Sequence, residues 1–374
     1  MIKAAEVAGF PRIPCVAHIL HNSVKTALEE NEAIKQLVKK CHKLATLFHA
    51  SPKMAQVLHA AQVDINDPGE QVLSVVMDVA TRWNSTLSML KRLVLLRAAI
   101  DIVRVQDDTE TAVKSKLKQH RLTTGEWEDV EILVKILEPV EEATKTFSST
   151  SQGLAADVAP CMAILMEELG ELGVSEIMAD FRDMLKMQLE ERLQLTDTVL
   201  IASALHPNYN TLWYMDDTAR AESIKKIIRA EYGSLAPNLA NTACQGKEVP
   251  IGESSMESTS TMQKLLKRRR FNENVDNRPP QSEDEFEGYF KHILTQGDVD
   301  PHAWWNVHKV DFPVMAKLAR KYLAVPATSV ASERVFSYAG NVLTDKRSRL
   351  KDDVVSDIVF CNYASKCLDR ARAR

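Results

Sequence analysis

Residues 326–340 read PATSVASERVFSYAG and place a carboxylate, Glu333, in the first turn of a predicted helix. Ser329 has a side chain suited to the N-cap of that helix. One apolar face of the helix is formed by Ala331, Val335, Tyr338 and Val342. Glu333 points away from this face, and the helix dipole favours an acid there by about 0.3–1 kcal/mol. Glu333 is therefore either an ordinary surface acid or the remnant of an active site.

The sequence on both sides of this stretch is also helical in pattern. Pro313 begins an amphipathic helix that carries Val314, Leu318 and Leu323. A last helix is predicted to place Leu350, Val354, Ile358 and Cys361 on one face. We expect residues 304–362 to form one compact unit.

The upstream sequence alternates between helical segments and one strand-like segment. Apolar residues from Ile34 to Phe48 recur at helical spacing, and Pro52 should end that helix. QVLSVVMDV, residues 71–79, follows a turn signal and predicts a strand. A helix is expected from residue 81, and another from Thr124 with a disturbance at Pro139.

The composition is that of a folded protein with one polar interruption. The chain has 374 residues, of which 45% are hydrophobic and 26% charged, and its net charge is -4. Because the net charge is slightly negative, the overall charge gives no indication of nucleic-acid binding. The sequence also contains no apolar run long enough for a membrane span or a secretory signal. The six scattered cysteines predict reduced thiols. Residues 233–285 are polar and charged, and we expect a disordered linker there.

Several segments together resemble one protein family. The Trp pair at 304–305, FPVMAKLARKYL, PATSVASERVFS, AGN and KRSRL resemble the C-terminal dimerisation region of hAT-superfamily transposases and of domesticated zinc finger BED-domain proteins. PCVAHILHNSV resembles the family's Cys-x-x-His segment through Cys15 and His18, and DVATRWNSTLSMLKRL its Arg-Trp segment through Arg82 and Trp83. The resemblance covers almost the whole chain apart from the linker.

The resemblance implies a fold that is mostly α with a small β remnant. This would be an incomplete ribonuclease H-like core, interrupted by a long all-helical insertion. The expected parts are a partial core at 1–80, the helical insertion at 81–232, the linker at 233–285, and a dimerisation region at 286–374 that completes the core. Residues 71–79 would be the core strand before the insertion.

The resemblance also implies the origin of Glu333. Transposases of this type hold two Mg²⁺ or Mn²⁺ ions with three carboxylates, and Glu333 matches the third. The first two would lie before Cys15, yet the first Asp of this sequence is Asp64. We therefore expect Glu333 to be vestigial, the chain to be truncated at its N-terminus, and no metal cofactor to be bound. The family's zinc finger pattern is also absent from this sequence.

Two Cys-His groupings offer an alternative metal site. Cys15, His18 and His21 form one, and Cys41 with His42 forms the other. Their spacing does not complete a structural zinc site, so core packing and local hydrogen bonding are the favoured interpretation.

Three groups of residues are candidates for residual DNA contact or nuclear import. The family resemblance would let Trp83 stack on a base and Arg82 meet phosphate, whereas burial of Trp83 against Leu87 is the favoured alternative. The basic residues Lys346, Arg347 and Arg349 are a second DNA candidate. A possible nuclear-import cluster comprises Lys264, Lys267, Arg268, Arg269 and Arg270, although a merely solvated run explains it equally well.

These observations favour a transposase-derived, non-catalytic dimerisation and interaction protein of the nucleus. It would form a homodimer, with weak DNA contact at most, and with no membrane or small-molecule substrate. The expected dimerisation residues are Val335, Phe336, Tyr338, Leu350, Val354, Ile358 and Phe360. The alternative is a metal-dependent transposase or nuclease component completed by carboxylates from an absent N-terminal part or another chain. A reading frame without a selected function is a third interpretation.

Overall fold

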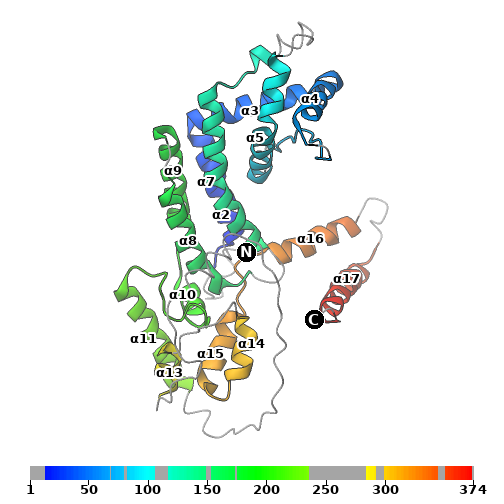
Figure 1. The fold of residues 1–374 in the computed structure, drawn as a ribbon. Coiled ribbons are helices and arrows are strands. Elements are labelled where there is room, and N and C mark those ends of the chain that lie inside the picture. Colours follow the sequence, from blue (N-terminus) through cyan, green and yellow to red (C-terminus); the bar gives the residue numbers. More distant parts are fainter. Residues whose placement is uncertain are drawn as a thin grey trace.

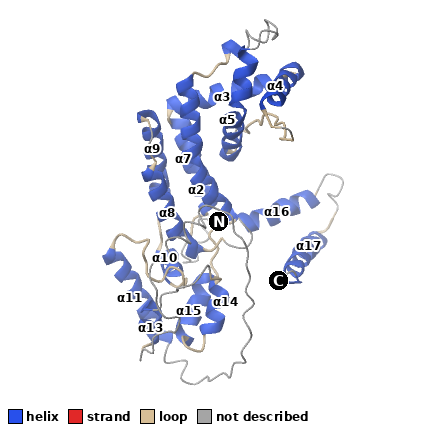
Figure 2. Cartoon of the chain, viewed as in Figure 1, coloured by secondary structure: helices blue, strands red, loops and turns tan. Residues whose placement is uncertain are grey.

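The computed structural model describes residues 13–67, 69–79, 82–105, 117–148, 153–172, 175–235, 284–291, 299–343 and 350–372. Regular structure in these ranges is helical (Figure 2). The α-helices are α2 (Val16–Glu30), α3 (Glu32–Ala50), α4 (Pro52–Ile65), α5 (Trp83–Val105), α7 (Thr124–Ser148), α8 (Val158–Glu171), α9 (Glu176–Arg192), α10 (Asp197–Ala204), α11 (Thr218–Leu235), α13 (Glu285–Lys291), α14 (Pro301–His308), α15 (Pro313–Leu323), α16 (Val330–Val342) and α17 (Asp352–Arg372). A 3₁₀ turn, η1 (Ala155–Asp157), precedes α8.

These helices form an elongated body and a projecting arm. Helices α2, α7, α8 and α9 run along the body, with α3 to α5 at one end and α10 to α15 at the other (Figure 1). We call α16 and α17 the arm, because they extend sideways from the middle of the body (Figure 1). No helix in the described part of the chain combines the length and apolar character needed to cross a bilayer.

The helical periodicity of the N-terminal half is confirmed. The apolar face of α3 is buried from Ile34 to Phe48. Asn31 caps α3 by accepting a hydrogen bond from the Ile34 N–H at 3.1 Å. Pro52 separates two helices, because it is the first residue of α4, where its missing N–H costs no helical hydrogen bond. Helix α7 continues through Pro139, so the expected disturbance does not end it.

Aromatic side chains hold α13 and α14 against α10. Tyr289 is fully buried and donates a hydrogen bond to the Ala204 carbonyl at 3.0 Å. Trp305 donates from Nε1 to the Leu205 carbonyl at 2.9 Å. Both acceptors lie at the C-terminal end of α10, where helical carbonyls lack intrahelical partners. The Trp pair is therefore part of the core.

The predicted strand at residues 71–79 is wrong. This segment has no strand partner in the described structure, and only Val79 forms an isolated bridge, with Arg82. Side chains satisfy its backbone instead: the buried Gln62 amide accepts from the Leu73 N–H at 2.8 Å and donates to the Leu73 carbonyl at 3.0 Å. Ser85 Oγ accepts from the Val79 N–H at 2.7 Å. A β pattern without an available sheet edge thus stays a single extended segment.

The described residues confirm the mostly helical fold class but not a ribonuclease H-like core. They contain two isolated bridges, Val79 with Arg82 and Leu154 with Pro326, and no β-ladder. The single compact unit expected at 304–362 is also wrong, because α14 and α15 join the body while α16 and α17 project from it (Figure 1). The predicted linker lies outside the described residues, except at its ends in α11 and α13.

Candidate functional site

Residues 325–329 join the body to the arm and bring Glu333 to the N-terminus of α2. The Ala155 N–H donates to the Val325 carbonyl at 2.9 Å, and the Ala327 N–H donates to the Gly153 carbonyl at 2.7 Å. The Val16 N–H in turn donates to the Ala327 carbonyl at 3.1 Å. Because α16 begins directly after these fixed residues, its first turn must lie beside the first turn of α2.

Gly153 is required by the close packing of this junction. A Cβ atom on Gly153 would lie 2.8 Å from the Phe147 carbonyl oxygen, which is closer than real Cβ atoms come. The Thr328 hydroxyl donates to the same carbonyl at 3.2 Å. Another contact comes from the arm, where Arg334 donates to the Ser148 carbonyl at 2.6 Å. The end of α7 therefore helps to set where the arm leaves the body.

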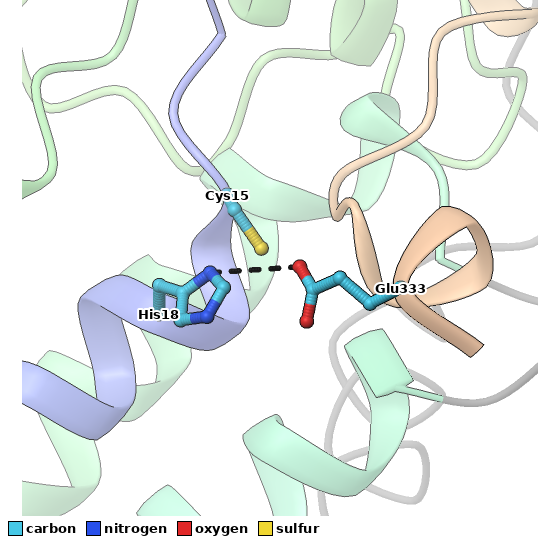
Figure 3. A group of neighbouring side chains, drawn as sticks. All are labelled: Cys15, His18 and Glu333. Carbon is cyan, nitrogen blue, oxygen red and sulfur yellow. Dashed lines mark ion pairs between the residues drawn. The ribbon is translucent and has the colours of Figure 1, made fainter. Parts of the chain in front are cut away.

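Glu333 faces Cys15 and His18, which belong to the Cys-x-x-His segment (Figure 3). The distance from His18 Nδ1 to Glu333 Oε1 is 3.9 Å, and one ligand atom from each of the three residues lies within 4.8 Å of the others. Cys15 is partly buried, whereas His18 and Glu333 are exposed. We call these three residues the Cys-His-Glu cluster.

Ser329 contacts two members of the Cys-His-Glu cluster. Its backbone N–H donates to Cys15 Sγ at 3.4 Å, and its hydroxyl donates to Glu333 Oε1 at 2.5 Å. Ser329 has the N-cap position predicted for it, but its side chain makes no capping hydrogen bond to the helix backbone. Its hydroxyl orients the carboxylate instead.

The donor set of this cluster does not fit a pair of Mg²⁺ ions. Hard divalent ions prefer several charged oxygen ligands, and a two-metal site needs carboxylates that bridge or flank both ions. The cluster offers one carboxylate, one thiol and one imidazole, and no second Asp or Glu of the described residues belongs to it. These residues alone therefore provide no basis for two-metal phosphodiester chemistry.

The second predicted Cys-His grouping is separated by the fold. Cys41 is fully buried in α3, and burial raises the pKa of its thiol to about 12. His42 is exposed and its Nδ1 lies 2.5 Å from Asp78 Oδ1. His21 is not part of the Cys-His-Glu cluster, and its pKa is lowered first by burial and then by Lys25 and His18. The described cysteines Cys15, Cys41, Cys161 and Cys361 are free thiols, as predicted.

The two DNA-contact candidates at the start of α5 differ in exposure. Trp83 is 4% exposed and belongs to the core, whereas Arg82 is exposed. The burial of Trp83 confirms the favoured interpretation and counts against the alternative in which its ring stacks on a base, because the ring packs in the core together with Leu87. The remaining basic candidates, Lys346, Arg347, Arg349 and the cluster at 264–270, lie outside the described residues.

The arm has an apolar groove between its two helices. The groove has a volume of about 490 Å³ and is lined by Val335, Phe336, Ala339, Val355, Ser356, Val359, Phe360 and Tyr363. Tyr338 lies edge-on to Tyr363, with ring centroids 6.2 Å apart. Phe336 and Phe360 are 74% and 72% exposed, which is unusual for side chains of this size.

The predicted dimerisation residues do not all share this groove. Val335, Phe336 and Phe360 line it. Val354 is exposed, Ile358 is half-buried, and Leu350 precedes α17. On α17 the groove is lined by Val355 and Val359, each one position after the predicted residues Val354 and Ile358. Their own four-residue spacing was the signal that could have identified them.

Two parts of the chain match models of known protein families. The model of the hAT family C-terminal dimerisation region matches residues 285–365, and that of the ZBED1 RNase-like helical domain matches residues 13–136. The first match contains the whole groove, and the second contains Cys15 and His18.

Curated relatives align with most of the chain at low identity. Zinc finger BED domain-containing protein 4 from Homo sapiens is 22% identical over 93% of this chain. Putative AC transposase from Zea mays is 23% identical over 94%, and zinc finger BED domain-containing protein 6 from Mus musculus is 24% identical over 96%. The chain spans 29%, 44% and 38% of these three proteins, respectively.

Proposed function

Since this chain is a relative of the hAT transposases and the zinc finger BED domain-containing proteins, we propose that it is a transposase-derived dimerisation protein that does not cut DNA by itself. The proposed partner is a second copy of the same chain, held through the arm. The proposed location is the nucleus, in keeping with transposase and zinc finger relatives.

The observation that carries the proposal is the exposed apolar surface of the arm. Helices α16 and α17 pack against each other, yet Phe336 and Phe360 remain largely exposed and Leu343 about half exposed. Isolated exposed apolar residues are ordinary, but a groove flanked by two exposed phenylalanines is a contiguous apolar surface that favours association. The dimerisation-region match at 285–365 contains this surface, which favours a second copy as its occupant.

A two-fold dimer fits the shape of the arm. In a two-fold contact the same patch is used by both chains, so one helix pair with both a groove and projecting side chains is self-complementary. Phe336 of each chain would enter the apolar groove of its partner. The body, whose core is closed by the packing of its own helices, would not need to change.

The absence of DNA cleavage is proposed from the donors around Glu333. A thiol and an imidazole occupy the space beside this carboxylate, and they are poor ligands for Mg²⁺. Glu333 is therefore proposed to be a retained residue of the family's catalytic set without its catalytic partners in the described part of this chain.

Sedimentation velocity of the intact chain at increasing concentration tests the dimer. We expect a monomer–dimer equilibrium, with the dimer favoured at high micromolar concentration. A chain that sediments as a monomer throughout this range would overturn the proposal.

A nicking assay on supercoiled DNA with Mg²⁺ or Mn²⁺ tests the second part of the proposal. We expect no metal-dependent nicking by the intact chain. Nicking that disappears in Glu333→Gln would instead assign the chain a catalytic role and make the transposase alternative correct. Nicking that Glu333→Gln retains would indicate a contaminating nuclease, and repeated purification must then remove it for the proposal to stand.

A further inference from the structure

We propose that Cys15, His18 and Glu333 form a binding site for one divalent ion of the zinc class. The site joins the first turn of α2 to the first turn of α16 (Figure 3). It differs from a two-metal magnesium site in its number of ions and in its ligand chemistry, and it does not depend on the arm forming a dimer.

The three donors match the chemistry of Zn²⁺. Zinc accepts thiolate sulfur, imidazole nitrogen and carboxylate oxygen, whereas Mg²⁺ prefers oxygen alone. A thiolate, a neutral imidazole and a carboxylate carry two negative charges together, which balance one divalent cation. Cys15 is also the N-cap residue of α2, where the positive end of the helix dipole favours a negatively charged ligand.

The three donors are already close to the spacing that zinc requires. Zinc bonds of about 2.0–2.3 Å place neighbouring donors of a tetrahedral site about 3.3–3.6 Å apart. The His18 Nδ1 to Glu333 Oε1 distance is 3.9 Å, and no two of the three donor atoms are more than 4.8 Å apart. The remaining difference of about 1 Å is within the range of side-chain rotation, because His18 and Glu333 are exposed.

The backbone that carries these donors is fixed independently of any ion. Val16, directly after Cys15, is bonded to Ala327, and the Ala327 N–H is bonded to Gly153. Ser329 then bonds both Cys15 Sγ and Glu333 Oε1, as the outer residues of a metal site do when they orient its ligands. A pre-positioned ligand set costs less entropy to close around an ion than three mobile side chains would.

Three protein donors leave the fourth tetrahedral position for water. Because His18 and Glu333 are exposed, solvent can reach that position. Three protein ligands with an open fourth position is an established zinc arrangement. A bound ion would tie the arm to α2 and restrict the direction in which the arm leaves the body.

Metal binding by the intact, chelator-treated chain tests the site. We expect calorimetry to give one Zn²⁺ per chain, and Co²⁺ to produce the near-ultraviolet charge-transfer band of a cobalt–thiolate bond. Cys15→Ser should abolish that band and weaken Zn²⁺ binding by at least about tenfold. Glu333→Gln should also weaken Zn²⁺ binding but keep the cobalt–thiolate band.

Cys361→Ser is the matched control, because Cys361 is an exposed thiol on α17 outside the cluster. It should bind Zn²⁺ and Co²⁺ like the unmodified chain. The unmodified chain and Cys361→Ser should also gain thermal stability with Zn²⁺, whereas Cys15→Ser should not.

Two outcomes would overturn this inference. One is Zn²⁺ binding that Cys15→Ser leaves unchanged, and the other is no stoichiometric Zn²⁺ binding by a folded chain. The His18–Glu333 contact would then be only an exposed ion pair. Neither result bears on dimerisation, since sedimentation of the metal-free chain tests that proposal separately.

Discussion

Phe336→Asp should dissociate the proposed dimer without unfolding the monomer. The Phe336 side chain is 74% exposed and lines the groove of the arm. It contributes little to the core of a single chain, so its replacement should leave monomer stability nearly unchanged. In a two-fold dimer, however, both copies of the side chain would be covered by apolar groups.

The size of the effect follows from the exposed area. A phenylalanine can bury about 200 Å², so 74% exposure leaves about 150 Å² on each chain. Covering both copies at about 25 cal/mol per Å² is worth up to about 7 kcal/mol. The entropy lost on association offsets much of this gain. If one-third of it appears in the measured free energy of dimerisation, Phe336→Asp should weaken the dimer by about 2.5 kcal/mol, or about 60-fold in Kd. The new carboxylates should add to this loss.

Sedimentation equilibrium gives the dimer Kd, and thermal unfolding at low concentration gives the monomer's stability. Leu95→Asp is the matched control, because Leu95 is 69% exposed on α5, far outside the dimerisation-region match. This control should leave Kd unchanged, since it adds the same charge to an equally exposed apolar position.

A change in Kd of less than about threefold in Phe336→Asp, which is under 1 kcal/mol, would refute the proposed burial of Phe336 in the dimer. An equal weakening of the dimer by Leu95→Asp would refute it too, because general charge repulsion would then explain both results. A large loss of monomer stability in Phe336→Asp would place this side chain in the core instead.

Three further predictions concern stability. Gly153→Ala should lower the free energy of unfolding in urea by about 1–3 kcal/mol, because its Cβ would meet the Phe147 carbonyl oxygen at 2.8 Å. Gly170→Ala is the control and should cost nothing, because its Cβ would make only ordinary contacts. Equal urea midpoints for Gly153→Ala and the unmodified chain would contradict this prediction. Burial, with nearby acids, raises the pKa of Glu168 to about 7 from 4.5, so the folded state binds this proton more tightly than the unfolded state. Ionised Glu168 therefore destabilises the folded protein increasingly as the pH rises from about 4.5 to about 7, and fully above pH 7. Because the side chain is half-exposed, Glu168→Gln should stabilise the protein by only about 1 kcal/mol near pH 8, and hardly at all near pH 4.5. An effect of this substitution that does not depend on pH in urea titrations would refute the raised pKa of Glu168. Tyr289→Phe should lower the free energy of unfolding by about 1 kcal/mol, because it removes the bond to the α10 carbonyl, and an unchanged urea midpoint would show that this bond is not stabilising.

Helix positions were predicted well because they depend on short-range spacing. The buried face of α3 and the start of α15 at Pro313 follow from residues within a few turns of each other. The strand at 71–79 failed for the opposite reason. A strand needs a partner that local sequence does not supply, and here Gln62 and Ser85 satisfy part of the segment's backbone.

The amino-acid sequence by itself determined the helical character and the family resemblance, and it predicted Glu333 as a candidate site residue. Only the tertiary structure decided that Glu333 lies beside Cys15 and His18, and that α16 and α17 leave the body as an arm. Periodicity records which side of a helix is apolar, but not what will cover it. Contacts between residues more than 300 positions apart depend on how the whole chain packs, here through the hydrogen bonds of residues 325–329.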